Sequence, residues 1–118
     1  MIALLSLFVI TTPVSAAVNT NIYVAYLGGS QLRVASYATA SSSLTYTTGS
    51  YIYVRNGVYK QGYKVTENDR YCDSTACSTS EILLMYESDK WFNSEGYYYY
   101  YNNGTISESG TNTKHLYT

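Results

Sequence analysis

Two cysteines form the pair whose spacing most directly predicts chemistry. Cys72 and Cys77 are the only cysteines of the chain, and the segment between them is rich in loop-forming residues. We expect them to form a disulfide that stabilises the fold by roughly 2 kcal/mol. A redox site would need a tighter C-x-x-C pair, and a zinc site would need about four ligands, for which His115 is the one other soft candidate. The sequence therefore predicts a structural disulfide and no metal site.

Catalysis has little support in the residue pattern. The single histidine, His115, has no acidic neighbour in the sequence to orient its ring, as a Ser-His-Asp or Cys-His mechanism requires. A glycosidase needs two carboxylates inside a cleft that a chain of 118 residues would struggle to build. The available carboxylates are Glu67, Asp69, Asp73, Glu81, Glu87, Asp89, Glu95 and Glu108. No phosphate-loop, dinucleotide or zinc-protease motif occurs. We expect a protein that is not an enzyme and has no cofactor.

The charge of the chain argues against two classes of partner. Seven Lys and Arg residues oppose eight Asp and Glu residues, and the cations are scattered between Arg33 and Lys114. Binding to a phosphate backbone or to anionic lipid depends on clustered positive charge. We therefore expect neither a nucleic-acid partner nor electrostatic attachment to a membrane.

Short strands separated by turns are the elements that must position the remaining residues. Apolar residues do not recur at helical spacing beyond the first sixteen residues, whereas short runs of Tyr, Val, Ile and Thr recur between Gly and Asn. This pattern predicts an all-β, antiparallel β-sandwich. The expected strands are residues 21–26, 31–38, 43–47, 50–54, 58–66, 82–86, 96–101, 105–109 and 114–117.

Two Asn-Gly dipeptides predict hairpin tips. Asn56-Gly57 and Asn103-Gly104 each lie between strand-forming residues, and Asn-Gly readily adopts the two positive φ angles of a type I′ turn. A shift of 47 residues superposes the two dipeptides and also places Tyr51 on Tyr98 and Tyr53 on Tyr100. The pattern favours two Greek-key-like halves of one sandwich, related by this repeat.

These hairpins would sort the sixteen tyrosines between two faces. Because side chains alternate along a strand, Ile52 and Val54 would point into the core while Tyr51 and Tyr53 point outwards. The repeat then places Tyr98 and Tyr100 on the outer face. Tyr51, Tyr53, Tyr98 and Tyr100 are the candidate binding residues, since tyrosine offers large, rigid and amphipathic contact area. The structural alternative is that tyrosine, a strong strand former, only stabilises an exposed sheet by cross-strand packing.

The first sixteen residues predict export. Residues 2–10 are apolar apart from Ser6, and Val14-Ser15-Ala16 has small residues at the two positions that a signal peptidase reads. The apolar run is far shorter than the roughly 20 residues that cross a bilayer. We expect cleavage after Ala16, so residues 1–16 are a signal peptide and residues 17–118 are one secreted domain with no membrane span. The missing positive charge ahead of the apolar run leaves open an upstream start, and a retained anchor is the alternative.

One segment resembles a known motif. In residues 82–93, Tyr86 is followed five positions later by Trp91 and then by Asn93. This arrangement is similar to the opening of a βγ-crystallin-like Greek-key motif, with Asn in place of Gly. The resemblance implies a Greek-key β-sandwich. The calcium motif of that family is absent, because Ile106 stands where Ser or Thr is expected.

These observations predict a small secreted binding module without enzymatic activity. Its partner would be a glycan, a cell-wall polymer, a cell-surface component or a protein that contacts the outer tyrosines. A secreted toxin or antimicrobial protein is one alternative. An extracellular matrix or coat component is another, since residues 97–101 are consecutive tyrosines that could associate between copies.

Overall fold

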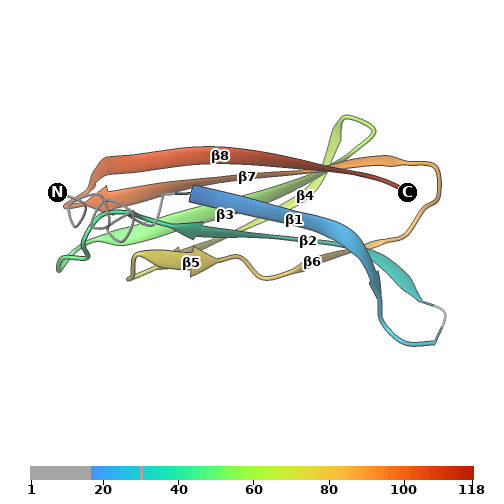
Figure 1. The fold of residues 1–118 in the computed structure, drawn as a ribbon, viewed down its shortest axis with the longest axis horizontal. Helices are drawn as coiled ribbons and strands as arrows, with labels where there is room; N and C mark the ends of the chain where they lie inside the picture. Colours follow the sequence, from blue (N-terminus) through green and yellow to red (C-terminus); the bar gives the residue numbers. More distant parts are fainter. Residues whose placement is uncertain (1–16, 30) are drawn as a thin grey trace, which may run out of the picture.

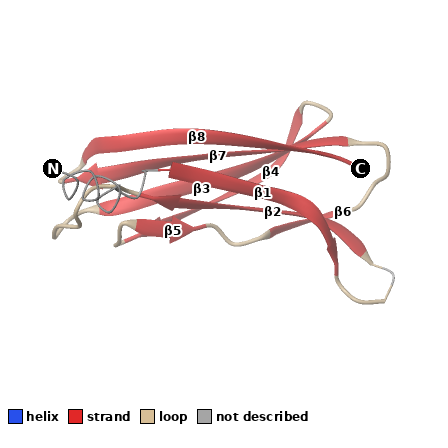
Figure 2. Cartoon of the chain, in the orientation of Figure 1, coloured by secondary structure: helices blue, strands red, loops and turns tan. Residues whose placement is uncertain are grey.

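The computed structural model describes residues 17–29 and 31–118, and the predicted signal peptide, residues 1–16, lies outside the described residues. The described chain contains eight strands and no helix (Figure 2). No helix in these ranges is therefore long and apolar enough to cross a membrane. The strands are β1 (Ala17–Tyr26), β2 (Leu32–Ser41), β3 (Tyr51–Lys60), β4 (Tyr63–Cys72), β5 (Ala76–Ser78), β6 (Ile82–Met85), β7 (Trp91–Asn102) and β8 (Thr105–Tyr117).

Two antiparallel sheets pack on one another, which confirms the predicted all-β sandwich (Figure 1). One sheet contains β1, β2, β5 and β6, with β5 and β6 both paired to β2. The other sheet has the order β4-β3-β7-β8. The chain crosses between the sheets after β2, β4 and β6, so each sheet is assembled from two separate segments of the sequence.

The core between the sheets consists of two apolar clusters. The first brings Val18, Ala38 and Ala40 of one sheet against Ile52, Val54, Tyr98 and Tyr100 of the other. The second contains Val34, Val58 and Phe92.

A buried ring of polar side chains also lies in this interior. Ser36 Oγ donates to Ser94 Oγ (2.8 Å), Ser94 Oγ donates to Asn56 Oδ1 (2.7 Å), and Asn56 Nδ2 donates to Ser36 Oγ (2.9 Å). Each hydroxyl both donates and accepts, so these bonds satisfy the buried hydroxyl groups.

The second Asn-Gly dipeptide forms the turn that the sequence predicts. Asn103 and Gly104 connect β7 to β8 and have φ angles of 51° and 78°. The first dipeptide does not form a turn, so that prediction is wrong. Asn56 and Gly57 lie in the middle of the continuous strand β3.

The β3–β4 turn is formed instead by Gln61 and Gly62, with φ angles of 54° and 83°. Gln61 is fixed in this conformation by the start of β7: its N–H donates to the carbonyl of Trp91 (2.8 Å), and its Oε1 accepts from the Trp91 N–H (2.6 Å). These contacts connect residues thirty positions apart, which turn propensity alone does not reveal.

Other strand boundaries also differ from the sequence predictions. Because the two Asn-Gly dipeptides are not equivalent, the structural repeat inferred from a shift of 47 residues is wrong.

Residues 43–47 form a loop and not a strand. Residues 105–117 form the single strand β8, where two strands were expected.

Candidate functional site

Six tyrosines form a connected group on the outer face of the β4-β3-β7-β8 sheet. Tyr53 is paired with Tyr71 of β4 on one side and with Tyr99 of β7 on the other. Directly paired residues share a face, and alternation along each strand places the remaining rings on the same side. We call this set the tyrosine platform: Tyr51, Tyr53, Tyr71, Tyr97, Tyr99 and Tyr101.

The rings of the platform contact one another across the strands. Tyr51 and Tyr101 are stacked with centroids 4.6 Å apart, and Tyr53 lies 4.6 Å from Tyr71 and 6.3 Å from Tyr99. The Tyr53 and Tyr99 rings are nearly parallel, with an interplanar angle of 8°. The remaining ring pairs of the platform are tilted or edge-on, arrangements that aromatic rings also favour.

Tyr53 holds the centre of the platform in place. Although it belongs to the outer face, its neighbours reduce its exposure to 5%. Its hydroxyl donates to Asp69 Oδ2 (2.9 Å) and accepts from Arg55 Nε (2.7 Å). The Arg55 guanidinium also lies 5.3 Å from the centroid of Tyr97, a cation–π distance. Burial, together with the bond to Asp69, raises the pKa of Tyr53 to about 12.

The charges beside the platform neutralise one another. Glu67 Oε2 lies 3.6 Å from Arg55 Nη1 and 2.7 Å from Lys64 Nζ. The hydrogen bond from Lys64 lowers the pKa of Glu67. A surface on which charges of both signs are paired has no strong field of one sign.

The structure brings together only half of the four sequence-predicted tyrosines. Tyr51 and Tyr53 lie on the outer face as predicted, whereas the predicted outer placement of Tyr98 and Tyr100 is wrong. Tyr98 is 1% exposed and Tyr100 is fully buried, because they pair with the core residues Val54 and Ile52. Tyr98 instead anchors the interior of the sheet, where its hydroxyl donates to Glu108 Oε1 (3.1 Å).

The sequence prediction does not include Tyr71, Tyr97, Tyr99 or Tyr101 of the platform, although the sequence contains a signal for the last three. All residues from 97 to 101 are tyrosine, so hydrophobicity cannot distinguish the two faces. Glu95, however, is an even number of positions from Tyr97, Tyr99 and Tyr101, so it lies on the same face of the strand. Its side chain is exposed. An unpaired carboxylate is costly to bury, so Glu95 indicates which face meets solvent. Arg55 gives the same indication for Tyr51 and Tyr53.

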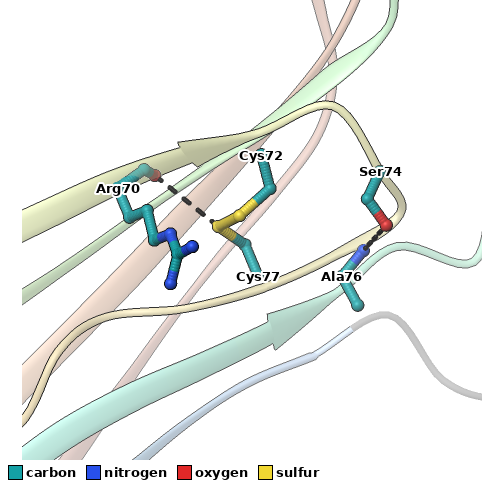
Figure 3. The surroundings of a disulfide bond; sticks show 5 residues. All are labelled: Arg70, Cys72, Ser74, Ala76 and Cys77. Atoms are coloured by element: carbon teal, nitrogen blue, oxygen red, sulfur yellow. Dashed lines mark hydrogen bonds between the residues drawn. A yellow bond between two sulfur atoms is a disulfide. The ribbon is translucent and has the colours of Figure 1, made fainter.

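The cysteine pair lies at the edge of this sheet. The Sγ atoms of Cys72 and Cys77 are 2.05 Å apart, the distance of a disulfide bond, as the sequence predicts (Figure 3). The bond connects the end of β4 to β5, which belongs to the other sheet. In the intervening loop, Ser74 Oγ accepts from the Ala76 N–H (3.3 Å). The pair therefore joins the two sheets next to the Tyr71 end of the platform.

Other places in the described chain offer less to a ligand. A pocket of about 150 Å³ lies at the opposite end of β4, lined by Lys60, Val65, Leu84, Met85, Glu87 and Phe92. It is smaller than the roughly 300 Å³ at which small-molecule sites begin. No group of three or more His, Cys, Asp or Glu side chains in residues 17–29 and 31–118 could hold a metal ion.

Comparison of the chain with protein-family models, with curated proteins and with solved structures finds no match. The resemblance of residues 82–93 to a βγ-crystallin-like motif stays a prediction.

Proposed function

We propose that this chain is a secreted, non-enzymatic binding module that recognises a cell-wall or cell-surface ligand through the tyrosine platform. The observation that carries the proposal is the contiguous array of six tyrosine rings on the outer face of the sheet. Export is supported by the apolar run and Val14-Ser15-Ala16 in the sequence, and by a cysteine pair at disulfide distance, which suits an oxidising compartment.

The platform is well suited to binding because it is rigid before any ligand arrives. Each tyrosine has few rotatable bonds, and contacts with neighbouring rings restrict them further. Binding then loses little side-chain entropy, which otherwise weakens association by about 1 kcal/mol for each ordered side chain. Tyr71, on the edge strand β4, is 63% exposed and gives a ligand direct access to the array.

The test is a pull-down of the purified protein on insoluble cell-wall polysaccharides and on whole cells. The double variant Tyr71→Ser/Tyr101→Ser removes two platform rings and keeps the buried residues Tyr53, Tyr98 and Tyr100 unsubstituted. We expect it to bind at least roughly tenfold more weakly than the wild type. Circular dichroism and denaturant unfolding verify that both proteins are folded.

The matched control is Tyr26→Ser/Tyr63→Ser. These two tyrosines are strongly exposed but lie outside the platform, so the control removes the same number of rings and hydroxyls. It should bind like the wild type. Absence of binding by the wild type, or equal loss in both double variants, would contradict a binding role for the platform.

A further inference from the structure

A second aromatic group lies on the same outer face, at the other end of β7. Trp91 pairs directly with Tyr117 of β8, and Asn93 pairs with His115, so these side chains share the face of the platform. The Trp91 ring lies 5.9 Å from His115 and 5.5 Å from Tyr117. We call Trp91, His115 and Tyr117 the tryptophan cluster.

The strand ends fix the position of this cluster. The backbone N–H of Trp91 donates to Gln61 Oε1 (2.6 Å), and the Tyr117 hydroxyl donates to Asp89 Oδ1 (3.3 Å). Trp91 is nevertheless 45% exposed. A large aromatic side chain that is positioned but still half open to solvent can bury further area on a ligand.

A single row of outward side chains connects the two aromatic groups. Along β7 the outward residues are Tyr101, Tyr99, Tyr97, Glu95, Asn93 and Trp91. Tyr97 and Trp91 are six positions apart, a distance of about 20 Å along a strand. Between the two ends, Glu95 and Asn93 supply hydrogen-bonding groups, and exposed Thr111 and Thr113 of β8 stand beside the row.

We infer that the platform and the tryptophan cluster are two ends of one elongated site for an uncharged, linear polysaccharide lying along β7. The inference rests on the proposed function and names the ligand class of that function. An uncharged ligand is favoured over an anionic one because the nearby cations, Arg55 and Lys64, are both paired with Glu67, while the exposed Glu95 lies within the row. A polyhydroxylated ligand is favoured because the outward row offers phenol, hydroxyl, amide and carboxylate groups beside aromatic rings. A linear polymer is favoured because the row is much longer than any one sugar unit.

Trp91 is the only tryptophan, so its fluorescence reports contact at this end of the row. We would titrate the purified protein with cellobiose and cellohexaose and with the matching chitin oligomers. In the series that the protein recognises, cellulose or chitin, the hexasaccharide should bind roughly tenfold more tightly than the disaccharide. It should also change the Trp91 emission, because only the longer chain reaches from the platform to the tryptophan cluster.

Two variants test the cluster itself by calorimetry. Trp91→Ala should weaken hexasaccharide binding roughly tenfold and leave disaccharide binding within about twofold, whereas Trp91→Phe, which keeps an aromatic ring, should restore most of the loss. Denaturant unfolding of each variant verifies that it is folded.

The outcomes separate this inference from the proposed function. Cell-wall binding that depends on Tyr71 and Tyr101 but not on Trp91 would overturn the elongated site and leave the platform standing. Binding that disappears after protease treatment of the cell walls, or that prefers polygalacturonate, would overturn the uncharged polysaccharide as ligand. If no preparation binds the wild type, the proposed function fails as well.

Discussion

The hydroxyl of Tyr53 donates to Asp69 Oδ2 at 2.9 Å while accepting from Arg55 Nε at 2.7 Å, so a carboxylate and a guanidinium hold one ring at the centre of the platform. Both partners lie on the same face of the sheet, directly opposite one another across β3 and β4. The three side chains therefore form one unit in which removal of the phenol oxygen affects two charged groups.

Replacement of Tyr53 by Phe should lower the free energy of unfolding by about 1 kcal/mol, because two hydrogen bonds to charged groups are lost while Arg55 and Asp69 remain accessible to water. Denaturant unfolding measures the change. Tyr99→Phe is the matched control, since Tyr99 also stacks in the platform but its hydroxyl bonds to no charged group among the described residues. An equal effect of both substitutions would contradict the role assigned to the Tyr53 hydroxyl.

Stability should fall at high pH because two buried tyrosines retain their protons in the folded state. Burial is the main cause that raises the pKa values of Tyr53 and Tyr98 from 10.0 to about 12, with added contributions from Asp69 and Glu108. Between these values the folded protein binds more protons than the unfolded chain, so the free energy of unfolding decreases as pH rises through this window. Below pH 10 the contribution of these two tyrosines to the free energy of unfolding is fully present.

Denaturant unfolding at a series of pH values measures this decline, and absorbance of ionised tyrosine follows the titration directly. The double variant Tyr53→Phe/Tyr98→Phe should show a shallower decline, which separates these two groups from lysines and from exposed tyrosines. An identical pH dependence in the variant and the wild type would show that other groups cause it.

The fold class and the local β7–β8 turn could be predicted from the sequence because their causes are local. Alternating strand-forming residues and an Asn-Gly turn act within a few positions. Asn56-Gly57 has the same local chemistry as Asn103-Gly104, but Ser36 and Ser94 satisfy the Asn56 side chain inside the core. That partnership depends on two other strands, which no short-range turn signal contains.

The error at Asn56-Gly57 also explains the error in the site. The presumed repeat assigned Tyr98 to the outer face because it aligned Tyr98 with Tyr51. In the structure, β3 and β7 pair so that Tyr51 lies opposite Tyr101. The strand register determines which tyrosines of β3 and β7 lie opposite one another. The charged residues Arg55 and Glu95, one on each strand, were the sequence signals that could have corrected it.

The buried ring of hydrogen bonds among Ser36, Asn56 and Ser94 should contribute strongly to stability. Asn56→Ala leaves a cavity and deprives Ser36 and Ser94 each of one hydrogen-bond partner, so we expect a loss of roughly 3 kcal/mol in the free energy of unfolding. Denaturant unfolding provides the measurement. The triple variant Ser36→Ala/Asn56→Leu/Ser94→Ala replaces the whole ring by apolar groups and should recover part of that loss. If the single variant unfolds like the wild type, the ring does not stabilise the core.

Gly96 should be required by the close approach of the two sheets. A Cβ atom at this position would collide with Cγ2 of Thr20 and lie 3.3 Å from Cβ of Ala38, both in the opposing sheet. Gly96→Ala should therefore lower the free energy of unfolding by about 1–3 kcal/mol, the usual cost of overpacking. Thr20→Ser removes the colliding methyl group and retains the hydroxyl that donates to Asn112 Oδ1 (3.1 Å).

A double-mutant cycle with Thr20→Ser decides whether this collision is the cause. In the Thr20→Ser background, Gly96→Ala should cost at least about 1 kcal/mol less than in the wild type, because the atom it meets is absent. Gly57→Ala is the matched control: it also lies within a strand, but its added Cβ would meet its nearest neighbour, Tyr59 Cε1, at an ordinary 3.5 Å. If Gly96→Ala lowers the free energy of unfolding equally in both backgrounds, the requirement for glycine at position 96 comes from backbone conformation and not from contact with Thr20.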